Sequence, residues 1–102
     1  MNTGTKQQFL CKLIPPRSTF AQDMTEAERR IMQEHATYWR DLSDRGIAII
    51  FGPVLDPKGT WGLAIIEVAD ESEAHTLGRN DPAVQAGLTF EVYPMPGAIV
   101  RK

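Results

Sequence analysis

Residues 25–46, TEAERRIMQEHATYWRDLSDRG, contain the clearest structural pattern of the chain. Thr25 and Glu28 are spaced as a capping box, in which the threonine hydroxyl accepts a free N–H of the first turn and the glutamate reaches back. The segment also carries one stripe at helical spacing, made of Ala27, Ile31, His35, Tyr38 and Leu42. Acids and bases four residues apart occupy the opposite face, which is typical of a solvated surface. Because Gly46 stands where a C-cap glycine belongs, the pattern predicts a helix over residues 26–45.

Short apolar segments on both sides of this helix have the composition of β-strands. The predicted strands are residues 8–14, 47–51, 61–68 and 88–93, with a polar connection at 17–24, a strand end at Gly52-Pro53 and a turn at 56–59. Asp70 and Glu73 predict a second helix to about residue 77, and Pro82 predicts one more helical turn. The order is βαββαβ, an α+β fold of the ferredoxin-like type, with a four-stranded antiparallel sheet and helices on one face.

The predicted strands are apolar on both of their faces. In the first strand, Phe9, Cys11 and Leu13 alternate with Leu10 and Ile14, and the next two strands also alternate two apolar sets. The helices can cover only one face, and the open face of an antiparallel sheet is normally polar. A second copy of the chain is the simplest cover for a second apolar face, so we predict a homodimer.

Length, composition and charge exclude several classes of protein. The chain has 102 residues, 42% apolar and 24% charged, which suits one soluble globular domain over residues 1–102. Its 11 basic residues are scattered and the net charge is −2, so no nucleic acid partner is expected. No apolar run approaches the ~20 residues that span a bilayer, and the first residues lack the apolar stretch of a signal peptide. We therefore expect no membrane partner and a cytoplasmic location.

His35 is the strongest candidate for chemistry, because its place in the apolar stripe directs it towards the sheet. A packed core histidine with one hydrogen bond is the simpler interpretation. A catalytic role needs a carboxylate that fixes the imidazole tautomer, and Asp81 is the candidate. Asp81-Pro82 is also an ordinary helix-capping turn, and sequence spacing cannot bring it to His35. On the residues alone both interpretations stay open.

The other reactive residue types form no recognisable pattern. Cys11 lies in the middle of a strand and is expected to be a small core residue, whereas His75 is expected in solvent. Neither has metal-ligand spacing with His35, so no metal site is predicted. Residues 59–62 lack the lysine and the spacing of a phosphate loop, and no cofactor is expected.

An ordered set of motifs resembles the YciI-like (YCII-related) domain family. The pattern is H-x2-Y-x3-L-x3-G at residues 35–46, then Gly52-Pro53, GTWG at 59–62 and D-P-x4-G-L at 81–88. The resemblance covers nearly the whole chain and implies a ferredoxin-like fold that dimerises through its sheets as an α+β barrel. It also implies a histidine and an aspartate that face a pocket between helix and sheet. By motif match these are His35 and Asp81, with Gly52-Pro53 at the pocket rim.

The resemblance favours a small cofactor-independent enzyme, since a related member is a dehydrochlorinase that acts on a chlorinated hydroquinone. In this hypothesis His35 transfers a proton, Asp81 holds the imidazole, and the substrate is a small cyclic or carbonyl-bearing molecule, as for a lyase or isomerase. Two alternatives stay open. One is a non-catalytic dimeric module that binds a small ligand or a partner protein, and the other is a relative of the cofactor-free monooxygenases.

Neighbouring residues receive secondary roles in this hypothesis. Tyr38, one turn after His35, is a candidate for a further hydrogen bond to the substrate site. The insertion at residues 15–24 is expected to bring Arg17, as an anion contact, or Phe20 to the pocket mouth. Trp39 is expected to pack at an edge or an interface.

Overall fold

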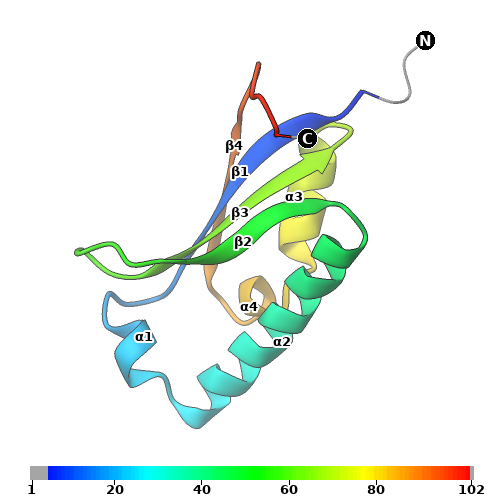
Figure 1. Cartoon of the computed structure of the whole chain (residues 1–102). Helices are drawn as coiled ribbons and strands as arrows, with labels where there is room; N and C mark the ends of the chain where they lie inside the picture. Colours follow the sequence, from blue (N-terminus) through cyan, green and yellow to red (C-terminus); the bar gives the residue numbers. More distant parts are fainter. Residues whose placement is uncertain (1–4, 102) are drawn as a thin grey trace.

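The computed structural model describes residues 5–101, and over this range the frame is a four-stranded antiparallel sheet with helices on one face (Figure 1). The elements in chain order are β1 (Gln7–Ile14), α1 (Phe20–Asp23), α2 (Glu26–Asp44), β2 (Ala48–Val54), β3 (Trp61–Val68), α3 (Glu71–Arg79), α4 (Pro82–Gln85) and β4 (Thr89–Pro94). The strand order is β2-β3-β1-β4, and each neighbouring pair is antiparallel. The predicted α+β, ferredoxin-like fold is confirmed.

Local capping explains where the helices begin and end. The Thr25 hydroxyl accepts the Glu28 N–H at 3.1 Å, and the Glu28 carboxylate accepts the Thr25 N–H at 2.9 Å, so the predicted capping box starts α2. Gly46 follows the helix with φ of +77°, a conformation that favours glycine, and lets the chain turn back towards β2. The Asp70 carboxylate likewise accepts the Glu73 N–H and starts α3.

Two segments differ from the sequence prediction. Residues 20–23, predicted as part of a polar connection, form the short helix α1, because Phe20 is buried against Leu13 and Leu88. Strand β2 continues through Gly52-Pro53 to Val54, whereas the prediction ended it at Phe51. This is possible because β2 lies at the edge of the sheet, where a proline need not donate to a second neighbouring strand.

The strand register divides the sheet into a covered and an open face. Cys11, Ala64 and Val92 are partners across three strands and lie in the core beneath the helices. In β2, strict alternation fails, because the pairing with β3 shifts between Ala48 and Ile50. As a result Ala48 and Phe51 both pack into the core, although the predicted alternation placed them on opposite faces.

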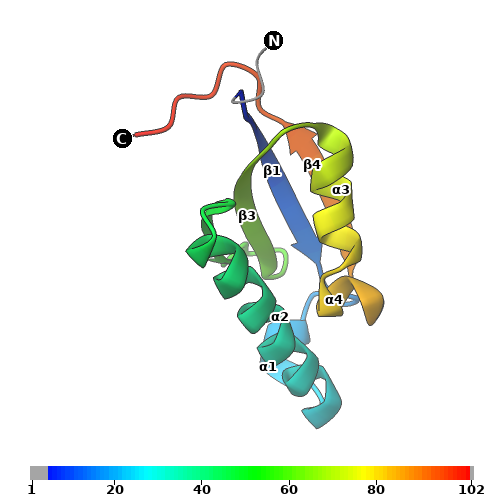
Figure 2. The same ribbon diagram turned by 90° about the vertical axis from the view of Figure 1, so that its right-hand side faces the viewer.

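The open face carries the second apolar set that the sequence predicted. Leu10 pairs with Ile65 there, and both alternate with core residues along their strands. At the β2 edge, Ile50 is 55% exposed. Figures 1 and 2 show α2 and α3 on the same side of the sheet, so no described helix covers this face.

The first turns of α2 reach beyond the end of the sheet (Figure 1). Ala27 is therefore exposed, although the stripe predicted that it would be buried. Only further along the helix do Trp39 and Leu42 enter the core. The space between this end of α2 and the sheet is bordered by α1 and contains the site described next.

Candidate active site

His35 and Asp81, 46 residues apart in the chain, form a hydrogen-bonded pair. His35 lies on α2, and Asp81 is the N-cap residue of α4. The Nδ1 atom of His35 lies 2.9 Å from Oδ2 and 3.1 Å from Oδ1 of the Asp81 carboxylate. The Asp81 side chain is fully buried, whereas the His35 side chain remains 18% exposed. The pair therefore links a buried carboxylate to an imidazole that borders open space.

Two further N–H groups hold the Asp81 carboxylate in place. The Trp39 Nε1–H donates to Oδ2 at 2.7 Å, and the Ala83 backbone N–H donates to Oδ1 at 2.8 Å. A carboxylate with these neighbours acts as an acceptor, so the hydrogen-bond network assigns the imidazole proton to His35 Nδ1. In the neutral form of the ring, the Nε2 atom of His35 then carries the lone pair, on the side away from Asp81.

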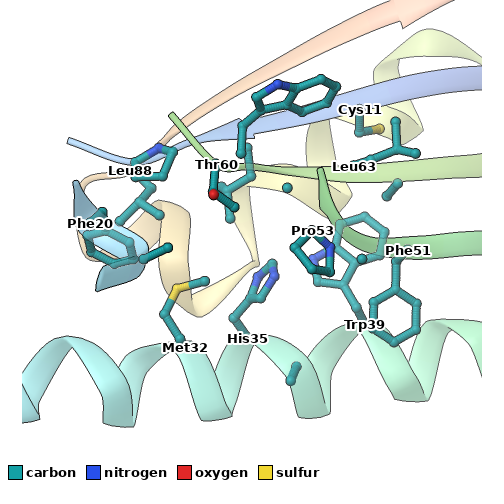
Figure 3. Close-up of a pocket in the computed structure, with 18 of the residues that line it drawn as sticks. Cys11, Phe20, Met32, His35, Trp39, Phe51, Pro53, Thr60, Leu63 and Leu88 are labelled. Atoms are coloured by element: carbon teal, nitrogen blue, oxygen red, sulfur yellow. The ribbon is translucent and has the colours of Figure 1, made fainter. Parts of the chain in front are cut away.

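A cavity of about 270 Å³ lies between α2 and the sheet and is bordered by the His35 ring. Figure 3 shows His35 rising from α2 into this space, with Phe20 and Met32 to one side and Phe51 to the other. Most of the lining side chains are aromatic or aliphatic and come from β1, α1, α2, β2 and β3. The cavity therefore suits a small ligand that is mostly apolar.

Gly52 and Pro53, expected at the rim of the site, both line the cavity. Their position depends on the continuation of β2 beyond Phe51, because this brings Pro53 into register with Gly62 of β3. A Cβ at position 52 would meet no atom within 4 Å beyond its chain neighbours, so there is open space beside Gly52.

Tyr38 and Arg17 are not among the residues that line the cavity. The Tyr38 hydroxyl instead donates to the Leu77 carbonyl oxygen of α3 at 2.7 Å, and so ties two helices together. Burial raises the Tyr38 pKa, and the nearby Asp81 charge adds to this effect. The Tyr38 hydroxyl proton is thus directed at α3, and the predicted hydrogen bond from Tyr38 to the substrate site stays a prediction.

Arg17 is bound by two carboxylates of its own region. Its guanidinium donates to Glu28 at 2.8 and 3.0 Å and to Asp23 at 2.8 Å, and its Cζ lies 5.2 Å from the centre of the Phe20 ring. The hydrogen bonds from Arg17 lower the pKa of Glu28 to about 2, and the backbone N–H of Thr25 adds to this shift. Arg17 thus joins α1 to the start of α2, while Phe20, also considered for the pocket mouth, does line the cavity.

Sequence reasoning missed two residues of the site. Trp39 was expected at an edge or interface, but it is 2% exposed and bonded to Asp81. Its spacing of four from His35, which places both on one face of a helix, was a usable signal. Thr60 lies on the opposite side of the cavity from His35 (Figure 3), and its place in the GTWG motif at residues 59–62 was the available signal.

The remaining candidates for chemistry lie outside the His35–Asp81 pair. Cys11 borders the cavity, and burial raises its thiol pKa to about 12. His75 is exposed on α3 and lies 3.3 Å from Glu71. Among residues 5–101, no group of three or more His, Cys, Asp or Glu side chains is arranged to hold a metal ion.

Residues 9–96 match the family model of the YCII-related domain. The chain belongs to the YCII-related domain family. The matched span of this YCII-related domain includes both members of the His35–Asp81 pair. No curated protein sequence matches the chain. In the described part of the domain, no helix is both long enough and apolar enough to cross a membrane.

Proposed function

We propose that this YCII-related domain is a small enzyme that transfers a proton on a small molecule, with His35 as the acid–base group. The observation that carries the proposal is the environment of Asp81, a buried carboxylate that meets the His35, Trp39 and Ala83 nitrogens at once. These contacts hold the imidazole, and the His35 ring borders a largely apolar cavity. An orienting carboxylate behind a histidine is the arrangement that acid–base catalysis needs.

The proposed reaction begins with a C–H bond next to a carbonyl or on an activated ring. His35 Nε2 takes the proton, and the C–H electron pair moves towards the carbonyl oxygen as an enolate. The imidazolium that forms is stabilised by the Asp81 carboxylate beside Nδ1. Return of the proton to another carbon completes an isomerisation. Loss of a leaving group from the adjacent carbon, as the enolate electrons form a C=C bond, completes an elimination.

The cavity limits the size of the substrate. A cavity of roughly 150 Å³ lined by Leu, Ile and Phe is large enough to bind benzene. The cavity beside His35, at about 270 Å³, accommodates a substituted ring of moderate size. We therefore propose a small cyclic or carbonyl-bearing substrate.

We also propose that a second copy of the chain covers the open face of the sheet. The support is the apolar set on that face, including the Leu10–Ile65 pair and the exposed Ile50. A contiguous apolar surface of this kind is rarely left in water by a monomeric protein. Lys12 and Glu91, cross-strand partners of opposite charge, lie on the same face and add polar contacts to such an interface.

Deuterium exchange tests the enzymatic proposal without knowledge of the natural substrate. The full chain is incubated in D2O with a panel of small cyclic ketones and phenols, and C–D formation is followed by NMR. We expect exchange on some members, with a rate at least about 100-fold lower in His35→Gln. His75→Gln is the matched control and leaves the rate unchanged, because His75 is exposed on α3. Saturable binding without exchange on any member would instead establish a ligand-binding module.

A further inference from the structure

We infer that Thr60 is the residue that positions the ligand, and that the ligand is an uncharged ring compound with a hydroxyl or carbonyl group. The inference rests on the proposed function only in that the ligand occupies the cavity beside His35. Thr60 supplies the hydrogen bond that orients the ring in the cavity, and in the proposed enzyme this orientation presents the reacting carbon to His35.

The polar side chains of the cavity leave few groups free for a ligand. Trp39 donates its Nε1–H to Asp81, and Trp61 donates its Nε1–H to Asp56 at 3.2 Å. Cys11 keeps its proton, because burial raises its pKa, and a thiol is a weak donor. Among the described lining residues, the side-chain groups that remain are the His35 Nε2 atom and the Thr60 hydroxyl.

Thr60 is placed opposite His35 by the packing of the β2–β3 connection. Gly59, with φ of +136°, lies so close to the chain before α1 that a Cβ at this position would be 3.0 Å from the Ser18 Cα. This contact holds the backbone immediately before Thr60. Figure 3 shows Thr60 on the sheet side of the cavity and His35 on the helix side, so the two side chains border the same space from opposite sides.

The lining also favours an uncharged ligand over an anion. No arginine or lysine is among the described residues around the cavity, and Arg17 is bound to Asp23 and Glu28. A carboxylate or phosphate that entered would lose its hydration without gaining a fixed cation. A hydroxyl or carbonyl group loses much less hydration free energy on entry. The Thr60 hydroxyl can donate to either group, and it can accept from a hydroxyl.

Three probes of similar size test the inference, namely phenol, toluene and benzoate. Their dissociation constants for the full chain are measured at pH 7 by NMR titration. In the wild type we expect phenol to bind roughly 3- to 10-fold more tightly than toluene, the effect of one neutral hydrogen bond, and benzoate to bind more weakly than either. Thr60→Val keeps the shape of the side chain without its hydroxyl, and Thr60→Ser keeps the hydroxyl.

We expect Thr60→Val to remove the preference for phenol without changing the affinity for toluene, and Thr60→Ser to retain the preference. Thr89→Val, the same change on an exposed residue of β4, is the matched control and leaves all three affinities unchanged. A preference for phenol that survives Thr60→Val and disappears in His35→Phe would overturn the role of Thr60. If benzoate binds as tightly as phenol, the inference that the ligand is uncharged is wrong. If none of the three probes binds, both the role of Thr60 and the proposed ligand class are overturned.

These outcomes are independent of the deuterium-exchange test. Loss of the phenol preference in Thr60→Val supports the binding role of Thr60 even where no exchange is found. Deuterium exchange that depends on His35 supports the proposed enzymatic function. If the phenol preference is then unaffected by Thr60→Val, Thr60 has no role in positioning the ligand.

Discussion

His35 and Trp39, one helical turn apart on α2, approach the same oxygen of a buried carboxylate. The Asp81 Oδ2 atom lies 2.9 Å from His35 Nδ1 and accepts the Trp39 Nε1–H at 2.7 Å. The other oxygen caps α4 by accepting the Ala83 N–H. The capping and functional interpretations of Asp81 are therefore compatible, because one carboxylate has enough lone pairs for both.

Replacement of Asp81 by asparagine should change the proton position on the His35 ring. In the wild type we expect the proton on Nδ1, detected from the ¹⁵N chemical shifts of the ring. The amide of Asp81→Asn can also donate, so we expect a mixture of tautomers and proton transfer slower by about 100-fold or more. The His75 ring, measured in the same spectra, should not change. Identical His35 tautomers in the two proteins would show that Asp81 does not orient the ring.

Trp39→Phe should destabilise the fold by about 1–3 kcal/mol, because the buried Asp81 loses a donor and a small void forms. The free energy of unfolding is measured by urea denaturation, followed by circular dichroism. Trp61→Phe is the matched control, since its indole N–H donates to Asp56, which is only partly buried. We expect Trp61→Phe to lower the free energy of unfolding by less than Trp39→Phe does. Equal losses in the two variants would argue against a special contribution from the Trp39–Asp81 bond.

Gly78→Ala should destabilise the domain by about 1–3 kcal/mol, because the added methyl group overpacks the core. A Cβ at position 78 would overlap the Phe90 ring, whereas one at Gly52 would meet nothing within 4 Å. Thermal unfolding compares Gly78→Ala with Gly52→Ala, which we expect to change little. A Gly78→Ala protein as stable as the wild type would mean that α3 can move away from β4 at no cost.

Acid should weaken the attachment of α1 to α2 through Glu28. Its pKa is lowered from 4.5 to about 2 in the folded chain, chiefly by hydrogen bonds from Arg17. The resulting stabilisation is complete above pH 4.5 and is lost as the pH falls towards 2. Glu28→Gln should therefore flatten the dependence of stability on pH in this window. Glu26→Gln, which removes a carboxylate from the same turn, is the matched control. Parallel curves for Glu28→Gln and the wild type would contradict the assignment.

Ile65→Glu should convert the proposed homodimer into a monomer. It places a charge in the centre of the open sheet face, opposite Leu10, where an interface between copies would bury it without a partner. Molar mass is measured by size-exclusion chromatography with light scattering. Gln33→Glu adds one negative charge to the exposed face of α2 and should remain dimeric. A wild-type chain that is monomeric at micromolar concentration would remove the dimer proposal.

Local patterns were sufficient to predict most of the fold. The capping box at Thr25 and Glu28, the stripe of α2 and the alternation in β1 involve residues a few positions apart, and short-range spacing reports such contacts directly. The errors occurred where a distant neighbour changed the outcome. Phe20 orders α1 because Leu13 and Leu88 bury it, and β2 passes through Pro53 because that strand lies at a sheet edge.

In the candidate site too, local spacing predicted some features, and contacts between distant residues decided the others. The stripe indicated that His35 faces the sheet, and the family motif pointed to Asp81, but spacing could not join residues 46 positions apart. Tyr38 and Trp39 are adjacent in sequence, yet one bonds Leu77 and the other bonds Asp81. Which group each side chain meets depends on how α3 and α4 pack against α2. A buried carboxylate must find donors, and only the folded chain determines which donors lie within reach.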